Sequence, residues 1–380
     1  MNSTVCLIPI DNYDEENVYQ AVKQGFDMLG GPLQFVRKSE GILVKPNLLN
    51  GFPPEKAVTT HPAVFGAVLR CLREAGCYDL RYGDGPGIAA NDPDNVVDVT
   101  GIRAMGQKYA AKYLDFKEAD EVDYFPGKVA RKFNLAKDVV DADAIISVCK
   151  MKTHALENIT GALKNQYGCV HSSSKGMGHA RYPNSRLFAD MIVDLNCYLM
   201  PRFYVMDGIV AMEGNGPASG DPVNMNVILM SKDPVALDSV FARLVYLLPQ
   251  NVPTCVSGYA AGLGTIREDE ITVRTPSETM NMTKAAKLYG KPDFKVSRDT
   301  AKFWDLSAAF ATIRPWFQKP VIDKKRCVGC GVCVRSCPAA GKAVHVGLNN
   351  KAKIDYKKCI RCYCCQEGCP AKAIKRKSFL

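Results

Sequence analysis

The chain has 380 residues and a net charge of +10, with 47% hydrophobic and 23% charged residues. This composition is typical of a folded globular protein and excludes an intrinsically disordered chain, and the length predicts two or three domains. No apolar run approaches the roughly 18 residues of a membrane span, and residues 1–10 lack a signal-peptide pattern, so we expect a cytoplasmic protein with no membrane partner.

Apolar runs and helical periodicities alternate along the first 250 residues. The expected strands are Val5–Ile10, Gly41–Val44, Leu80–Tyr82, Asp143–Cys149, Phe203–Met206 and Val227–Met230. The expected helices are Glu15–Leu29, a helix from Pro62 that Gly76 ends, Arg186–Met200, and a helix from Pro234 to about Leu248. Residues 91–135 show no clear pattern. The alternation predicts an α/β domain with a mainly parallel sheet flanked by helices.

Four of the expected strands lead into polar segments. These segments contribute Lys45 and Asn47, then Asp84, then Lys152 and His154, and finally Asp207 and Glu213. In an open parallel sheet, ligands bind beyond the carboxyl ends of the strands. We therefore expect these side chains to gather at one edge of the sheet.

Lys152 and His154 are the strongest catalytic candidates. Side chains alternate along an extended segment, so these two point to the same side, where a lysine beside a histidine suits anion binding with proton transfer. Lys164 and Asn165, at the next expected helix, suit binding of the same anion. A Gly- and Ser-rich loop with two histidines follows at His171–His179.

Some of these motifs also have a purely structural explanation. Lys45-Pro46-Asn47 can be a turn, and His61 can cap the helix that begins at Pro62. The chain contains neither the P-loop pattern nor the dinucleotide-binding glycine spacing, so no classical nucleotide site is expected.

Eight cysteines near the C-terminus form two copies of the pattern C-x-x-C-x-x-C-x-x-x-C-P, and each position recurs 32 residues later. In two-cluster bacterial ferredoxins the fourth cysteine of each run ligates the other cluster. We therefore predict one 4Fe-4S cluster on Cys327, Cys330, Cys333 and Cys369, and a second on Cys359, Cys362, Cys365 and Cys337. A zinc site or disulfide framework would more often show paired C-x-x-C motifs or irregular spacing. Cys364 is an additional cysteine within the second run, which we expect to be no ligand.

The seven other cysteines share no ligand spacing and are expected to be small core residues. Oxygen-labile clusters beside so many free thiols predict a reducing cytoplasm, such as that of an anaerobe.

Positive charge is concentrated in the cysteine-rich segment. Residues 321–380 contain 14 Lys and Arg against 3 Asp and Glu. A basic segment can bind nucleic acid, but here cluster thiolates supply compensating negative charge. We favour that compensation, together with docking of an acidic electron donor, over nucleic acid.

Several segments resemble the family of the domain of unknown function 362. They are Lys45-Pro46-Asn47, Thr60-His61-Pro62, Gly83–Gly87, Lys150–His154, Thr160–Asn165 and Asp207-Gly208. Residues 321–372 resemble the bacterial two-cluster ferredoxin module, which that family often carries. The resemblance implies a pocket with an attached electron-transfer module and implies no particular reaction. The expected domains are residues 1–285, a packed connector at 286–320 and the ferredoxin-type domain at 321–380.

We predict an iron-sulfur oxidoreductase. A low-potential donor such as ferredoxin or flavodoxin would supply single electrons, which reach an anionic small molecule or a cofactor at the sheet edge. His154 or His61 would supply protons, Lys45, Lys152 and Lys164 would hold the acidic group, and Asp84 and Asp207 would orient the lysines or a metal. A further cofactor, such as a flavin, or a metal in the N-terminal domain is compatible with the sequence.

Two alternatives stand beside this prediction. The chain could be a non-catalytic electron carrier or assembly factor with a ligand-sensing or docking N-terminal domain. It could also catalyse redox-neutral chemistry with structural clusters, which an arrangement suited to electron relay disfavours.

Overall fold

The computed structural model describes residues 2–87, 92–182, 184–298 and 319–377. Its centre is a ten-stranded sheet in the order β12-β11-β1-β10-β9-β7-β2-β3-β4, with β8 paired to β7. These strands are β1 Ser3–Pro9, β2 Ile42–Pro46, β3 Leu80–Tyr82, β4 Lys112–Tyr113, β7 Ala144–His154, β8 Asn158–Thr160, β9 Phe203–Glu213, β10 Asp221–Ser231, β11 Ile271–Arg274 and β12 Thr279–Met280. From β9 to β4 the neighbours run parallel, whereas β10 is antiparallel to both β1 and β9. The predicted mainly parallel α/β sheet is confirmed.

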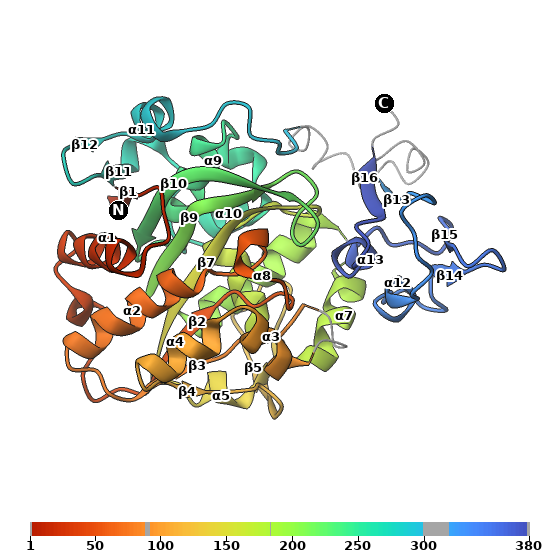
Figure 1. Cartoon of the computed structure of the whole chain (residues 1–380), viewed down its shortest axis with the longest axis horizontal. Coiled ribbons are helices and arrows are strands. Elements are labelled where there is room, and N and C mark those ends of the chain that lie inside the picture. The colour runs from red at the N-terminus through yellow and green to blue at the C-terminus, as the bar shows by residue number, and fades with distance from the viewer. Residues whose placement is uncertain (1, 88–91, 183, 299–318, 378–380) are drawn as a thin grey trace.

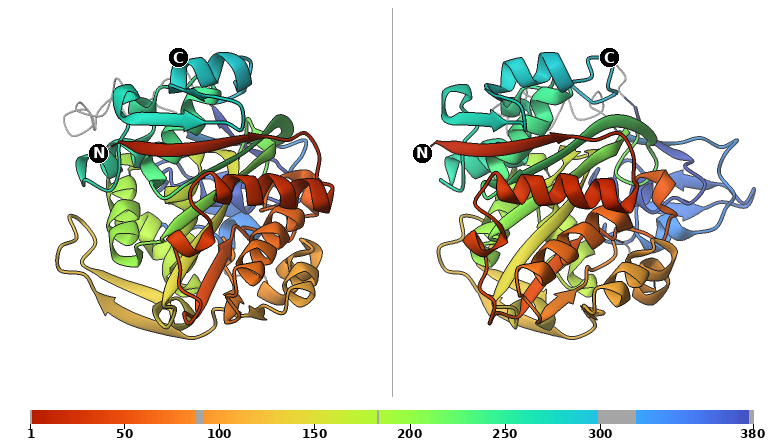
Figure 2. Two further views of the ribbon diagram at one scale, coloured as in Figure 1. Left: turned by 90° about the vertical axis from the view of Figure 1, so that its left-hand side faces the viewer. Right: turned by 60° about the vertical axis from the view of Figure 1, so that its left-hand side comes forward.

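Helices cover both faces of the sheet (Figures 1 and 2). One face packs against α1 Glu15–Asp27, α2 Pro62–Glu74, α3 Pro93–Val99 and α4 Ile102–Lys108. The other packs against α6 Ala162–Asn165, α8 Ser185–Leu199, α9 Pro234–Leu244, α10 Pro253–Ala260 and α11 Met282–Tyr289. Alternation explains the two layers, because in β9 Phe203 and Val205 enter the first core while Tyr204 and Met206 enter the second.

Side-chain caps fix where several helices begin. Asp14 caps α1, and Asp233 accepts hydrogen bonds from the backbone N–H groups of Val235 and Ala236 at the start of α9. The ring of His61 caps α2 by accepting from the Ala63 N–H, with Pro62 in the first turn. The sequence therefore encodes these boundaries locally.

A hairpin and the C-terminal module complete the fold. The strands β5 Ala119–Asp123 and β6 Lys132–Ala136 form a hairpin next to α5 Lys137–Val140. The C-terminal module has β13 Lys319–Ile322 paired with β16 Ile374–Lys377, β14 Val344–Val346 paired with β15 Ala352–Ile354, and the short helices α12 Val332–Arg335 and α13 Cys364–Glu367. No helix among the described residues is long and apolar enough to cross a lipid bilayer.

The C-terminal module packs at the end of the sheet, beside α7 Ser172–Arg181 (Figure 1). The Gln366 side chain donates to Asn215 Oδ1 at 2.8 Å and to the Gly216 carbonyl at 3.0 Å. Lys372 donates to the Gly220 carbonyl at 3.2 Å. These contacts attach the module to the loop between β9 and β10.

Three expectations about local structure were wrong. Lys150–His154 continues β7 instead of leaving it, because β8 and β9 both pair with this end of the strand. Asp207 lies inside β9, whose pairing with β10 extends to Glu213. The expected loop 171–179 forms most of α7, which a tertiary hydrogen bond from the Tyr167 hydroxyl to the Lys175 carbonyl supports.

The expected connector at 286–320 is described only in part. Phe294 is fully buried in the core under α9 and α11, whereas residues 299–318 lie outside the described residues.

Candidate active site

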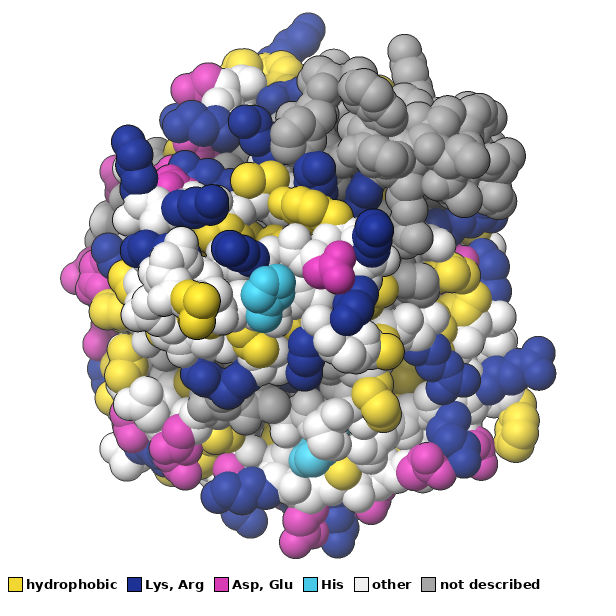
Figure 3. All heavy atoms as spheres, turned by 90° about the vertical axis from the view of Figure 1, so that its right-hand side faces the viewer, with side chains coloured by type: hydrophobic (Ala, Val, Ile, Leu, Met, Phe, Trp, Pro, Cys, Tyr) yellow, Lys and Arg dark blue, Asp and Glu magenta, His cyan; other side chains and the backbone are white. Residues whose placement is uncertain are grey.

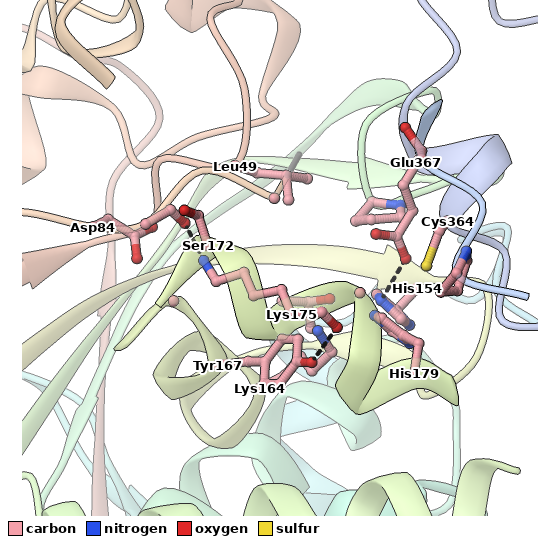
Figure 4. A pocket seen from close by; sticks show the side chains of 18 of the residues that line it. Leu49, Asp84, His154, Lys164, Tyr167, Ser172, Lys175, His179, Cys364 and Glu367 are labelled. Atoms are coloured by element: carbon pink, nitrogen blue, oxygen red, sulfur yellow. Dashed lines mark hydrogen bonds and ion pairs between the residues drawn. The ribbon is translucent and has the colours of Figure 1, made fainter. Parts of the chain in front are cut away.

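A cavity of about 520 Å³ lies between the carboxyl ends of the parallel strands and the C-terminal module. The first domain contributes side chains from the segments after β2 and β3, from β7, and from α6 and α7 (Figure 4). The module contributes Cys337, Cys364 and Glu367, among others. The cavity is therefore formed jointly by the two parts of the chain.

The structure brings together six of the predicted first-domain site residues. The residues that line the cavity are Asn47, Asp84, Lys152, His154, Lys164 and Asn165. They meet because β3, β2 and β7 are adjacent and parallel, so that their carboxyl ends share one edge. Their catalytic and binding roles stay predictions.

Lys45 and Asp84 form a buried ion pair at the floor of this edge. Lys45 Nζ lies 2.7 Å from Asp84 Oδ1, and both side chains are at most 2% exposed. The other carboxylate oxygen accepts the Leu48 N–H at 2.6 Å, and Gly168 leaves no room for a side chain beside this carboxylate. The pair fixes the segments after β2 and β3 against each other.

Lys152 belongs to a network of uncharged partners. Its Nζ donates to Asn47 Oδ1 at 2.7 Å and to the Val58 carbonyl at 2.6 Å. Asn47 in turn donates to Asn165 Oδ1 at 3.2 Å. Burial, together with the positive charge of Lys164, lowers the pKa of Lys152 to about 7.

His154 lies next to Glu367 of the module at one side of the cavity (Figure 4). The backbone N–H groups of Leu156 and Glu157 donate to His154 Nδ1, each at 3.1 Å. This assigns the proton of the neutral ring to Nε2, which lies 3.2 Å from Glu367 Oε1. Burial and the nearby Lys164 lower the pKa of His154, so we assign a neutral imidazole whose Nε2 faces the carboxylate. The two facing atoms approach without the geometry of a hydrogen bond.

Several cavity-lining polar groups have no hydrogen-bond partner among the described residues. They include Thr160 Oγ1, Ser336 Oγ and His179 Nδ1, and also the facing atoms His154 Nε2 and Glu367 Oε1. Lys164 Nζ likewise has no hydrogen bond or carboxylate partner there, and lies 4.9 and 5.3 Å from the ring centres of Tyr167 and Phe188. Buried polar groups in native proteins are nearly always paired, so these buried atoms and the partly exposed Lys164 can form hydrogen bonds with water or with a polar ligand.

Lys164 is presented by the short helix α6, which depends on a distant carboxylate. Asp238 of α9 accepts the Ala162 N–H at 2.7 Å and the Leu163 N–H at 3.1 Å. Burial raises the pKa of Asp238 to about 7, although the two backbone hydrogen bonds oppose the shift. The start of α6 is thus anchored to the helix layer beneath the sheet.

Four predicted residues lie outside the cavity lining: Lys45, which pairs with Asp84, and Asp207, His61 and Glu213. Asp207 accepts from Tyr13 at 2.8 Å and pairs with Lys150 at 2.7 Å, while the His61 ring stacks on Tyr13. Burial lowers the pKa of His61 to about 4. Glu213 instead binds the backbone and side chain of Lys295. The continuation of β9 past residue 206 explains why Asp207 and Glu213 do not reach the cavity.

The sequence did not single out four other cavity residues as site residues. Lys175 of α7 donates to the Gly85 carbonyl at 2.6 Å, and burial lowers its pKa to about 8. His179, also in α7, stacks on Phe188. Cys364 and Glu367 come from the module. The histidines of the Gly- and Ser-rich segment could have pointed to the cavity residues of α7. Nothing in the sequence indicates that the module packs against the first domain, so Cys364 and Glu367 could not be found in this way.

The eight cysteines form two groups with the predicted membership. Cys327, Cys330, Cys333 and Cys369 line one small hollow, and Cys337, Cys359, Cys362 and Cys365 line another. Backbone N–H groups lie 3.3 to 3.4 Å from Sγ of Cys327, Cys337 and Cys369. Within the described ranges no three Cys, His, Asp or Glu side chains are grouped for a single ion. Ligation by each cysteine stays a prediction.

Both parts of the chain match the profiles of known protein families. The profile of the domain of unknown function (DUF362) matches residues 42–243, and that of a 4Fe-4S dicluster domain matches residues 319–370. The thylakoid-associated protein sll1697 of Synechocystis sp. is 29% identical over 273 residues, which cover 69% of this chain and 81% of that protein.

Solved structures show only a distant likeness. The lactate racemase apoprotein from Thermoanaerobacterium thermosaccharolyticum has a TM-score of 0.43 and 12% identity, over 68% of this chain and 65% of that chain. A Thermotoga maritima protein has a TM-score of 0.36 and 11% identity, over 60% of this chain and 57% of that chain. The chain thus spans less than two thirds of each solved chain.

Proposed function

The chain belongs to the DUF362 family and carries a 4Fe-4S dicluster domain, which supports an iron-sulfur electron-transfer role, and from this premise we propose that it is a ferredoxin-linked oxidoreductase. In this proposal two 4Fe-4S clusters transfer electrons to an anionic small molecule that binds in the cavity between the two parts of the chain. The proposal combines the cysteine spacing with the position of the cavity.

One observation carries the proposal. Cys337 lines both the cavity and the hollow of the second cysteine group. Cys364, which neighbours Cys365 in the chain, also lines the cavity. A ligand in the cavity would therefore lie directly beside the second cluster, with no intervening layer of protein.

The charge of the cavity supports an anionic ligand. Lys152, Lys164 and Lys175 line it, together with Arg335 and Lys342 at its module side. Of the two carboxylates that line it, Asp84 is paired with Lys45 and Glu367 faces His154. Lys164 and the unpartnered hydroxyl groups are thus available to a carboxylate or phosphate.

The bound clusters supply single electrons, and the chain supplies the remaining functions. Lys164 holds the anionic group, Lys45 and Asp84 fix the cavity floor, and the module excludes water from one side. His154 can donate its Nε2 proton into the cavity when the ligand displaces Glu367. An additional organic cofactor or metal in this cavity would meet the same groups.

The exposed face of the module suits an acidic electron donor such as ferredoxin or flavodoxin. Figure 3 shows lysine and arginine side chains gathered over the face of the molecule that bears the module. Lys324, Lys325 and Arg326 are exposed directly before Cys327, and Cys330 of the first group is itself exposed. Complementary charge would dock the donor beside the first cluster.

We expect anionic metabolites to bind the cavity and to reoxidise the reduced protein. A panel of carboxylates and phosphates is screened by thermal shift under anaerobic conditions, and the hits are added to dithionite-reduced protein. Lys164→Ala should weaken binding about tenfold or more, because hydrogen bonds to charged groups contribute roughly 1.5–3 kcal/mol.

Lys137→Ala is the matched control, since Lys137 is exposed on α5 and does not line the cavity. Hits that bind without reoxidising the clusters would contradict the oxidoreductase and favour a carrier with a ligand-sensing domain. Equal affinity of both variants would contradict the placement of the anion.

A further inference from the structure

Three buried lysines of the parallel strands differ in their partners. Lys45 and Lys150 each have a carboxylate oxygen at 2.7 Å, from Asp84 and Asp207. Lys152, which is 1% exposed, has only the Asn47 side-chain oxygen and the Val58 carbonyl. Of the three, only Lys152 lines the cavity. Lys152 is therefore the one of these three lysines that lines the cavity and has no carboxylate partner among the described residues.

The two hydrogen bonds of Lys152 match the donors of a neutral amine. They use two N–H groups, and both acceptors are neutral oxygens. A neutral amine has two N–H groups and one lone pair, so both donors are satisfied and the lone pair is left for the cavity. A protonated amine would instead hold a buried charge without a carboxylate, which costs free energy.

We propose that Lys152 is an amine nucleophile that forms a Schiff base with a 2-oxo acid. The inference rests on the proposed role of the cavity as the substrate site, and it is independent of electron transfer. Lys164, whose ammonium has no carboxylate partner in the part of the chain that the structure describes, would hold the carboxylate of the acid. The hydroxyl of Thr160, which is buried and unpartnered there, would donate a hydrogen bond to the ketone oxygen of the acid.

The reaction balances with the groups present. The Lys152 nitrogen forms a bond to the carbonyl carbon, and the carbon–oxygen bond breaks. One amine proton and one proton from solvent leave with the oxygen as water. The other amine proton stays on the protonated imine, where Asn47 or Val58 can still accept it. A lysine next to a second cation in a desolvated site is a recognised way to activate such an amine.

The charged groups around Lys152 come from several elements, and burial has the largest effect on its pKa. Lys164 of α6 and Lys150 of β7 lower its pKa, whereas Asp84 after β3 and Glu367 of α13 raise it. The result, a pKa of about 7, means that the neutral amine is present at neutral pH. Adduct formation should therefore rise through pH 7 and level off above it, while exposed lysines react increasingly up to their ordinary pKa of about 10.4.

The test uses the full holoprotein under anaerobic conditions with its clusters oxidised. Pyruvate is the probe, and sodium cyanoborohydride reduces any imine to a stable secondary amine. We expect peptide mapping to find one adduct, on Lys152, and to find none in Lys152→Arg. The other lysines of the same digest are internal controls. An adduct spread over exposed lysines, or the same yield in Lys152→Arg, would overturn the proposal.

A second comparison separates this inference from the proposed function. Acetone replaces pyruvate as a neutral ketone, and both probes are used on the wild type and on Lys164→Ala. We expect pyruvate to label the wild type about tenfold better than acetone, and this preference to vanish in Lys164→Ala. Equal labelling of Lys152 by both ketones in the wild type would contradict the anion site. If pyruvate binds measurably but does not label Lys152, the Schiff base is contradicted and the anion site is not. Iron content verifies that each variant is folded.

Discussion

Replacing Cys359 by Ala is expected to lower the iron content from about eight to about four atoms per chain and to stop reoxidation by the cavity ligand. Cys359 belongs to the second cysteine group and does not line the cavity. Its loss therefore acts through the cluster and leaves the ligand contacts intact. Iron analysis and the visible absorbance of dithionite-reduced protein after addition of the ligand measure both effects.

Two variants control this result. Cys364→Ser should keep the full iron content, because Cys364 is absent from both cysteine groups. Cys330→Ala should lose the first cluster and keep reoxidation by the ligand when dithionite is the reductant. Unchanged reoxidation in Cys359→Ala would contradict the assignment of the second cluster as the electron donor to the cavity.

Asp84→Ala should lower the free energy of unfolding by about 3–5 kcal/mol, because it leaves the Lys45 ammonium buried without its partner. Lys45 is fully buried, so water cannot readily replace the carboxylate. The Leu48 N–H also loses its acceptor. Chemical denaturation under anaerobic conditions measures the change.

The paired variant separates the ion pair from the shape of the site. Lys45→Met combined with Asp84→Asn removes both charges and keeps an acceptor for Leu48, so it should be more stable than Asp84→Ala. Asp79→Ala is the surface control, since Asp79 pairs with Arg81 at an exposed site and should cost about 1 kcal/mol or less. Equal losses from Asp84→Ala and Asp79→Ala would contradict a structural role for the buried pair.

Much of the cavity edge could be predicted from strand order and alternation. Lys45, Asp84 and Lys152 each follow or end a short apolar run, and adjacent parallel strands carry such positions to a common edge. The exact repeat of the cysteines likewise predicted two groups of four. The positions of these side chains follow from local patterns, whereas their roles stay predictions.

The rest of the site depends on packing between distant segments. The sequence pattern predicts that a strand ends just before Asp207, but the antiparallel partner β10 extends β9 and keeps Asp207 with Lys150 and Tyr13. α7 contains two glycines and depends on tertiary contacts from Tyr167 and Lys175. Glu367 and Cys364 lie among the predicted cluster ligands in the sequence, and only the docking of the module turns them toward the first domain.

The most direct test of the central claim is the composition of the anaerobically purified protein. Iron, sulfide and other metals are measured, and organic molecules released on denaturation are identified by mass spectrometry. The account predicts about eight iron atoms per chain and an anionic molecule that is retained by the wild type and lost from Lys164→Ala. Zinc in place of iron, or eight iron atoms with no anionic molecule in the wild-type cavity, would contradict it.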